Sequence, residues 1–336
     1  MTPRDVFLKA LRRMPTARPA AGSATSVVTM DLMDKVGVYF PDAHLDAEKM
    51  AGLAAAGRTV IGFDNVMPLF SVCHESAALG CKIDWGARDL MPSVVGTLYQ
   101  ITDEIVVPRD FLTRPETTVP LRAISILKKR FGDDAAVVGK VFGPWTLGYH
   151  LFGVEDFLIN TILAPRLVKR AIDQAKEITV AFGLAQIEAG ADALCLADHA
   201  TRDLCSPENY TEFLSAVHGE LVERLPCPLI LHICGDTADR IGYIRDTGVA
   251  CFHYDSKVPA AAARRLAGDR LSLMGGTSNF RVIREGTPDA IAADVAEKIS
   301  LGIDIIGPEC AVPLDAPYRN MSTLVDEVKR LPPRGG

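Results

Sequence analysis

The stretch Leu229-Ile230-Leu231-His232-Ile233-Cys234-Gly235-Asp236 is an apolar run that ends in an imidazole, a thiol and a turn. A short run of aliphatic residues bounded by turn residues predicts a buried β-strand. Successive side chains on a strand point to opposite faces, so His232 and Cys234 are expected to project from the same face. A second short apolar run, 302–306, is followed by Cys310. We therefore predict that two strands end in ligands for one metal ion.

The type of ligand indicates which metal this is. Three nitrogen and sulfur ligands with a vacant position are typical of a catalytic zinc (Zn²⁺), whereas a structural zinc is usually closed by four protein ligands. Simple packing is the alternative, because cysteine is among the most buried residue types and behaves as a small hydrophobe. Position favours the metal, since both runs end in glycine-containing turns, where parallel-sheet proteins carry their chemistry.

Composition limits the class of protein. The 336 residues are 48% hydrophobic and 23% charged, which suits one large α/β core or two smaller ones. A net charge of −6 leaves no basic stripe, so we expect no nucleic-acid partner. The sequence shows neither an apolar run of 18 residues nor a signal-peptide core, so we expect no membrane association and a cytoplasmic location. Eight scattered cysteines argue against a disulfide framework.

Strand-like and helix-like patterns alternate along most of the chain. The predicted strands are 26–30, 59–66, 136–141, 193–197, 229–236, 249–254, 271–274 and 302–306. This alternation favours a (β/α)₈ TIM barrel in a single domain, 1–336, with an N-terminal helical extension of about residues 1–25. The absence of any Gly-x-Gly-x-x-Gly or Walker-type loop after a strand removes the main functional reason to prefer an open sheet. Segment 81–107 lacks sustained periodicity and is predicted to be an excursion that covers a site.

Several polar residues follow predicted strands and should share the C-terminal rim of the barrel, where TIM-barrel active sites lie. They include Asp64, Asp198, His199 and Asp255. We predict catalytic roles for the last three. Asp255 would be a fourth zinc ligand or a hydrogen-bond partner of His232, and Asp198 with His199 would contact a substrate. Strand-end, cap and loop contacts are the alternatives for all of them.

Four motifs carry a family resemblance. They are Pro92-Ser93-Val94-Val95-Gly96, Glu188-Ala189-Gly190-Ala191-Asp192, Leu231-His232-Ile233-Cys234-Gly235 and Gly307-Pro308-Glu309-Cys310. The set resembles the uroporphyrinogen decarboxylase superfamily, and within it the methylcobamide:coenzyme M methyltransferase branch. The resemblance implies a (β/α)₈ barrel and a zinc held by His232, Cys234 and Cys310. It also implies methyl transfer from a separate methylated corrinoid protein, carrying a methylcob(III)amide, to a thiol of the coenzyme M type or to tetrahydrofolate.

The chemistry of zinc favours the thiol acceptor. A thiol with a pKa of about 8.5 is mostly protonated at neutral pH, and coordination to zinc removes its proton. Arg281 and Arg284, just beyond the seventh predicted strand, are candidates to hold a sulfonate on such a thiol. Relatives usually have a Gly-Asn pair after that strand, whereas this chain has Gly275-Gly276-Thr277-Ser278, with Asn279 as a possible replacement.

Three alternative functions remain open at this point. The first is a methylcorrinoid:tetrahydrofolate methyltransferase. The second is a uroporphyrinogen decarboxylase-like enzyme, which the missing Arg-rich N-terminal motif of the decarboxylases disfavours. The third is a structural or sensing zinc protein without enzymatic activity, which would be expected to carry Cys-x-x-Cys pairs, and the sequence has none.

Overall fold

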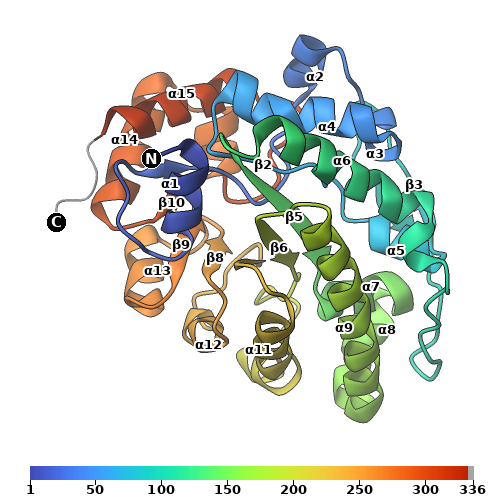
Figure 1. The fold of residues 1–336 in the computed structure, drawn as a ribbon. Coiled ribbons are helices and arrows are strands. Elements are labelled where there is room, and N and C mark those ends of the chain that lie inside the picture. The colour runs from blue at the N-terminus through green and yellow to red at the C-terminus, as the bar shows by residue number, and fades with distance from the viewer. Residues whose placement is uncertain (332–336) are drawn as a thin grey trace.

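Eight parallel strands form the centre of the computed structural model, which describes residues 1–331 (Figure 1). Their order across the sheet is β1-β10-β9-β8-β7-β6-β5-β2, and helices surround them. The strands are β1 Ala20–Ala21, β2 Asn65–Val66, β5 Ala136–Phe142, β6 Ala193–Ala197, β7 Leu229–His232, β8 Cys251–Tyr254, β9 Ser272–Gly275 and β10 Ile305–Ile306. The predicted (β/α)₈ barrel is confirmed. A separate antiparallel hairpin pairs β3 Lys82–Asp84 with β4 Ser93–Val95.

The helices begin and end largely where their capping residues predict. Thr2 forms a capping box with Asp5, and Thr287 caps a helix that has Pro288 in its first turn. The principal helices are α1 Pro3–Ala10, α2 Met30–Val36, α3 Asp42–Leu45, α4 Ala47–Ala56, α5 His74–Leu79, α6 Pro115–Phe131, α7 Pro144–Phe152, α8 Val154–Leu163, α9 Pro165–Glu188, α10 Pro207–Asn209, α11 Ser215–Arg224, α12 Ile241–Asp246, α13 Ala260–Ala267, α14 Pro288–Ser300 and α15 Tyr318–Arg330. Four shorter turns are η1 Gly57–Ile61, η2 Phe111–Thr113, η3 Tyr210–Leu214 and η4 Asn279–Arg284. No helix in the described part of the chain is long and apolar enough to cross a membrane.

The prediction of a first strand at 26–30 is wrong. Thr29 instead precedes helix α2, and the first strand is the two-residue β1, which pairs with β10 and lies inside the predicted N-terminal extension. Two alanines carry little intrinsic preference for a strand, so only their pairing with β10 makes them one. The barrel therefore begins earlier in the chain than the sequence pattern indicates.

The second predicted strand, 59–66, is mostly wrong as well. Its first half continues helix α4 as the wider turn η1, which ends at Gly62 with a φ of +98°. Only Asn65 and Val66 form β2. The β-branched residues of this segment therefore adopt helical structure because the preceding helix continues through them, which shows tertiary context overriding strand propensity.

The edges of the sheet meet between β1 and β2, and no ladder joins these two strands within residues 1–331. One backbone hydrogen bond, from the Asp64 amide to the Ala21 carbonyl at 2.8 Å, and the side chain of Asn65 join the two segments instead. Its Oδ1 accepts from the Ser23 amide at 3.1 Å, and its Nδ2 donates to the Ser23 carbonyl at 2.7 Å. A Cβ at Gly22 would lie 2.5 Å from Asn65 Oδ1, so the close approach of the two segments requires glycine there.

Asp64 is not on the C-terminal rim as predicted. It precedes β2 and therefore lies at the opposite, N-terminal end of the barrel. Its buried carboxylate pairs with the Arg18 guanidinium at 2.6 and 2.8 Å and accepts from the Ala21 amide at 3.0 Å. Helix α1 lies at the same end, where the backbone amide of Arg4 donates to the carbonyl of Asp134, just before β5. Residues at this end therefore stabilise the fold, and a candidate active site is expected at the C-terminal rim.

Candidate functional site

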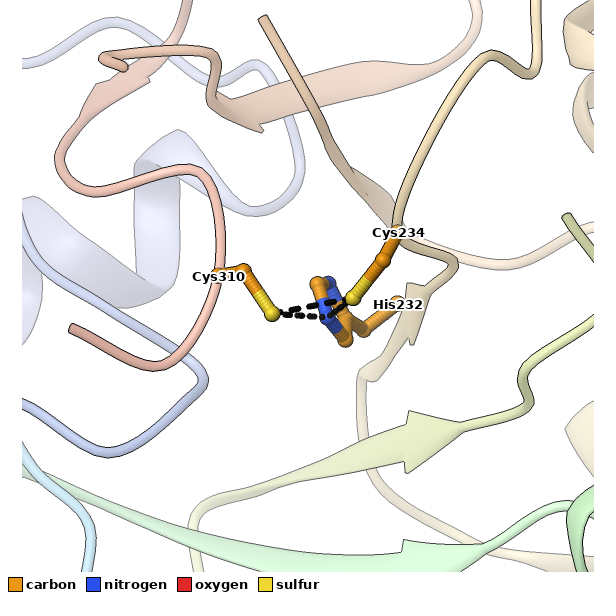
Figure 2. A group of neighbouring side chains, drawn as sticks. All are labelled: His232, Cys234 and Cys310. Atoms are coloured by element: carbon orange, nitrogen blue, oxygen red, sulfur yellow. Dashed lines mark hydrogen bonds between the residues drawn. The ribbon is translucent and has the colours of Figure 1, made fainter. Parts of the chain in front are cut away.

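Three predicted ligands converge at the C-terminal rim (Figure 2). His232 ends β7, Cys234 follows two residues later, and Cys310 lies beyond β10. His232 Nε2 lies 3.0 Å from Cys234 Sγ and 3.5 Å from Cys310 Sγ, and the two sulfurs are 2.9 Å apart. Among residues 1–331 this is the one group of three or more His, Cys, Asp or Glu residues whose ligand atoms lie close enough together to hold a metal ion.

The donor set fits a zinc ion. Two Zn–S bonds of about 2.3 Å at the tetrahedral angle place their sulfurs about 3.8 Å apart, so the two thiols need to separate by about 1 Å to accept the metal. His232 Nδ1 lies 3.3 Å from the carbonyl oxygen of His253. A hydrogen bond there places the ring proton on Nδ1 and leaves Nε2 as the metal ligand. The site therefore offers two thiols and one correctly oriented imidazole.

The two thiols affect each other's ionisation. The hydrogen bond from the Cys234 thiol, together with the nearby His232, holds the pKa of Cys310 well below its usual value. The same hydrogen bond, together with burial, raises the pKa of Cys234. The arrangement therefore favours ionisation of Cys310 over ionisation of Cys234. A divalent metal would remove the second proton, because both sulfurs bind metals as thiolates.

Asp255 supports the loop that carries Cys234. Its Oδ2 accepts from the Gly235 amide at 2.8 Å, and its Oδ1 accepts from the Lys257 amide at 2.9 Å. The predicted hydrogen bond from the His232 ring to Asp255 is not formed, because His232 Nδ1 faces the His253 carbonyl instead. A role as a fourth zinc ligand stays a prediction.

Glu309 performs a similar task for Cys310, and sequence reasoning missed it. Its carboxylate accepts from the Asn279 amide at 2.8 Å and from the Ser256 amide at 2.9 Å. Burial raises the pKa of this carboxyl group. The Asn279 side chain donates to the Ala311 carbonyl at 2.8 Å, so it holds the same loop. The position of Glu309 directly before a ligand was the available signal.

Asp198 is an anchor between helices. It is fully buried, and its Oδ2 lies 2.9 Å from His218 Nε2 on α11. Its Oδ1 accepts from the amide and the hydroxyl of Thr146, in the first turn of α7, at 2.8 and 3.2 Å. The Thr146 hydroxyl in turn accepts from the His199 amide at 2.7 Å. These contacts fix the turn that presents His199, whereas the predicted catalytic roles of Asp198 and His199 stay predictions.

A cavity of about 640 Å³ lies beside the residues described above. Its walls include the three metal-ligand candidates and the Asp198-His199 turn. Residues 91–94 and Gly96, in and around strand β4, line it, whereas the covering role predicted for 81–107 stays a prediction. Lys140 of β5 also lines it, and the sequence analysis did not single out this residue. Arg281 and Arg284 do not line it, and both are exposed.

Comparison with known proteins assigns nearly the whole chain to one family. A family model described as Uroporphyrinogen decarboxylase (URO-D) matches residues 2–331. The chain belongs to the uroporphyrinogen decarboxylase family. The resemblance inferred from its four motifs is thereby confirmed.

Relatives within the uroporphyrinogen decarboxylase family cover nearly the full length of the chain. A methylated-thiol:coenzyme M methyltransferase from Methanosarcina mazei is 34% identical over 95% of this chain and 85% of its own. The methylcobamide:CoM methyltransferase MtaA from Methanosarcina barkeri is 32% identical over 95% of both chains. A solved structure described as a methyltransferase from Methanosarcina mazei superposes with a TM-score of 0.95 at 30% identity, covering 98% of this chain and 99% of its own.

Proposed function

We propose that this protein is a zinc-dependent methyltransferase that moves a methyl group from a methylated corrinoid protein to a small thiol of the coenzyme M type. The observation that carries the proposal is the convergence of His232, Cys234 and Cys310 at the wall of a cavity of about 640 Å³. The names of the full-length relatives support both the corrinoid donor and the thiol acceptor.

The reaction needs a nucleophilic sulfur. A new S–CH₃ bond forms while the Co–CH₃ bond breaks, the cobalt keeps the electron pair, and the acceptor thiol loses its proton. When bound, zinc would act as a Lewis acid that lowers the pKa of the acceptor thiol. The protein's own part is to hold the ligands. Asp255 and Glu309 bind the two loops that carry Cys234 and Cys310 through backbone amides, and so preorganise the site.

The cavity walls supply positioning and exclude water. Phe142 and Tyr149 line the cavity together with the segment around β4. An environment poor in water strengthens electrostatic interactions with the reacting sulfur. We propose that His199, which lies in the wall next to the ligand group, faces the acceptor. The corrinoid would come from a separate methylated protein that docks over the open rim.

The thiol acceptor is preferred to tetrahydrofolate for a chemical reason. A site of two thiolates and one neutral imidazole balances the charge of zinc and leaves a bound sulfur electron-rich. The N5 amine of tetrahydrofolate already carries a lone pair and needs no such activation. Tetrahydrofolate is therefore the second candidate acceptor, and it is included in the test below.

The test combines metal analysis with a transfer assay. Purified, zinc-loaded protein is mixed with methylcobalamin or a methylated corrinoid protein and then with a thiol or tetrahydrofolate. Loss of the methyl-corrinoid spectrum and appearance of the methyl thioether report transfer. Cys310→Ala should lose zinc and activity, whereas the matched control Cys227→Ala, which lies outside the ligand group, should keep both. Failure of transfer with every corrinoid donor would overturn the proposal.

A further inference from the structure

Lys140 lies in the middle of β5 with its side chain inside the barrel. Every residue of this strand is buried, and Lys140 is only 4% exposed. Side chains alternate between the two faces of the strand, and this alternation shows which way the Lys140 side chain points. A Cβ on Gly139 would lie 2.4 Å from Gln186 Oε1 on α9, so Gly139 faces the outer helices and Lys140 faces the interior. There it lines the same cavity as the metal-ligand candidates.

The ammonium group of Lys140 has no direct ion-pair partner among the described residues. No hydrogen bond or ion pair to its Nζ is found in the part of the chain that the structure describes, residues 1–331. Its nearest aromatic contact is the ring of Phe142, with the centroid 6.0 Å from Nζ. The two other buried lysines are both paired: Lys176 with Glu220 at 2.7 Å, and Lys298 with Asp294. Buried charges are normally paired, so Lys140 is an exception that needs an explanation.

Among the described carboxylates, Glu75 is the one whose charge acts on Lys140 most strongly. Its Oε1 accepts from the Phe142 amide at 3.0 Å, and it makes no ion pair with Lys140. Burial raises the pKa of Glu75 to about 7 and lowers the pKa of Lys140. Among the described residues, therefore, no carboxylate is bonded to the Lys140 ammonium group.

Strand register relates Lys140 to the metal-ligand candidates. Phe142 is paired with Ala197, which in turn is paired with His232, so these three residues form one layer of the barrel. Lys140 stands two residues earlier on β5, which places it about 7 Å deeper along the strand. The sulfur and imidazole ligands and Lys140 thus line one cavity, and the backbone of Lys140 lies deeper in the barrel than theirs. Lys140 is also the only Lys or Arg among the cavity-lining residues in the described chain.

We propose that Lys140 binds the anionic end of the methyl acceptor and thereby selects short thiols that carry a sulfonate or a carboxylate. The inference rests on the proposed function for the thiol end of the molecule, which would lie at His232, Cys234 and Cys310. The anionic end needs only Lys140. An oxyanion beside Lys140 pairs with the ammonium group and offers acceptors for its donors.

The first experiment measures acceptor selectivity in the transfer assay. Wild-type protein should use 2-mercaptoethanesulfonate and 3-mercaptopropionate better than neutral 2-mercaptoethanol or cationic cysteamine. The Lys140→Met variant should raise KM for the two anionic thiols at least tenfold and lower the ratio of kcat/KM for the anionic thiols to that for 2-mercaptoethanol by a similar factor. The matched control is Lys176→Met, another buried lysine, which is paired and lies outside the cavity; it should leave selectivity unchanged. Equal selectivity in Lys140→Met and wild type would overturn the proposal.

The second experiment needs neither corrinoid nor metal. Binding of ethanesulfonate and of propanoate to the metal-free protein is measured by calorimetry or ligand-observed NMR, and the two anions separate a sulfonate site from a carboxylate site. Wild type should bind at least one of them, and Lys140→Met should weaken that binding at least tenfold. Circular dichroism and thermal unfolding check that the variant is folded, and Lys140→Gln serves as a second neutral variant.

The two experiments fail in distinguishable ways. If no donor supports methyl transfer while anion binding still depends on Lys140, the proposed function fails and the anion site stands. If wild type binds neither anion, or if both neutral variants bind as well as wild type, the anion site is refuted whatever the transfer assay shows. A Glu75→Gln variant that alone abolished the selectivity would also refute it, because Glu75 would then be the group that sets it.

Discussion

Replacing Gly143 by alanine tests whether Asp198 anchors the turn that presents His199. Gly143 is the residue before α7, with a φ of −71° and a ψ of 156°, a conformation that alanine adopts without strain. A Cβ there would lie 2.1 Å from Asp198 Cγ and 2.3 Å from its Oδ2. The substitution therefore acts as a steric wedge against one buried carboxylate and leaves the local backbone preference unchanged.

The size of the effect follows from what Asp198 would lose. It is fully buried and cannot move aside without lengthening its hydrogen bonds to His218 and Thr146. Overpacking costs about 1 to 3 kcal/mol, and a hydrogen bond to a charged group contributes about 1.5 to 3 kcal/mol. We expect Gly143→Ala to lower the free energy of unfolding by about 3 to 5 kcal/mol. Transfer activity should fall as well, because the turn bearing His199 shifts.

Urea unfolding followed by circular dichroism measures this change. The control is Gly52→Ala in the middle of α4, where a Cβ meets nothing within 4 Å. There we expect a gain of about 0.5 to 1 kcal/mol, since alanine restricts the unfolded chain more than glycine does. A loss below about 1 kcal/mol in Gly143→Ala, with an unchanged dependence on urea, would show that Asp198 gives way freely and that the anchoring argument is wrong.

Three further predictions concern the metal, acid and a buried arginine. Wild type should bind close to one zinc per chain, whereas Cys310→Ala should bind zinc at least tenfold more weakly in a chelator competition; full occupancy in the variant would exclude Cys310 as a ligand. Burial lowers the pKa of His44 to about 3, so its contribution to stability is full above pH 6.5 and is lost as the pH falls toward 3, about 2 kcal/mol of it by pH 5. His44→Phe should therefore lose less stability than wild type between pH 7 and pH 5, and parallel pH curves would contradict this. Arg240 is fully buried and donates to two carbonyls of the 200–205 loop at 2.6 and 2.7 Å. Its replacement by methionine should cost about 3 kcal/mol in thermal unfolding, and a cost near zero would show that water satisfies that loop.

Strong local patterns made most of the barrel predictable. The strands from β5 to β10 and the long helices between them carry continuous apolar runs and recognisable caps, so local sequence and tertiary context agree there. His232 and Cys234 could be paired from strand alternation alone. Cys310, 76 residues after Cys234, needed the rule that parallel strands bring their carboxyl ends to one rim.

The features that escaped prediction depend on contacts between distant parts of the chain. Ala20 and Ala21 are a strand only because β10 lies beside them. Lys140 looks like a polar residue on the solvent side of a strand, and its burial follows from the closure of the barrel around it. Glu309 binds amides on two other loops that no spacing in the sequence relates to it. Such residues become visible only when the topology is known.

The junction between β1 and β2 is the one place in the described barrel where neighbouring strands share no ladder. Contacts of Asp64 with Ala21 and of Asn65 with Ser23 join these two strands, whereas every other neighbouring pair of strands in the described sheet shares a ladder. Amide protons around 20–25 should therefore exchange with solvent earlier than those of β6 and β7, although both regions are buried. Thr25 and Ser26, which follow β1, form part of the cavity wall. Local opening of the sheet at this junction would therefore expose that part of the cavity wall to solvent.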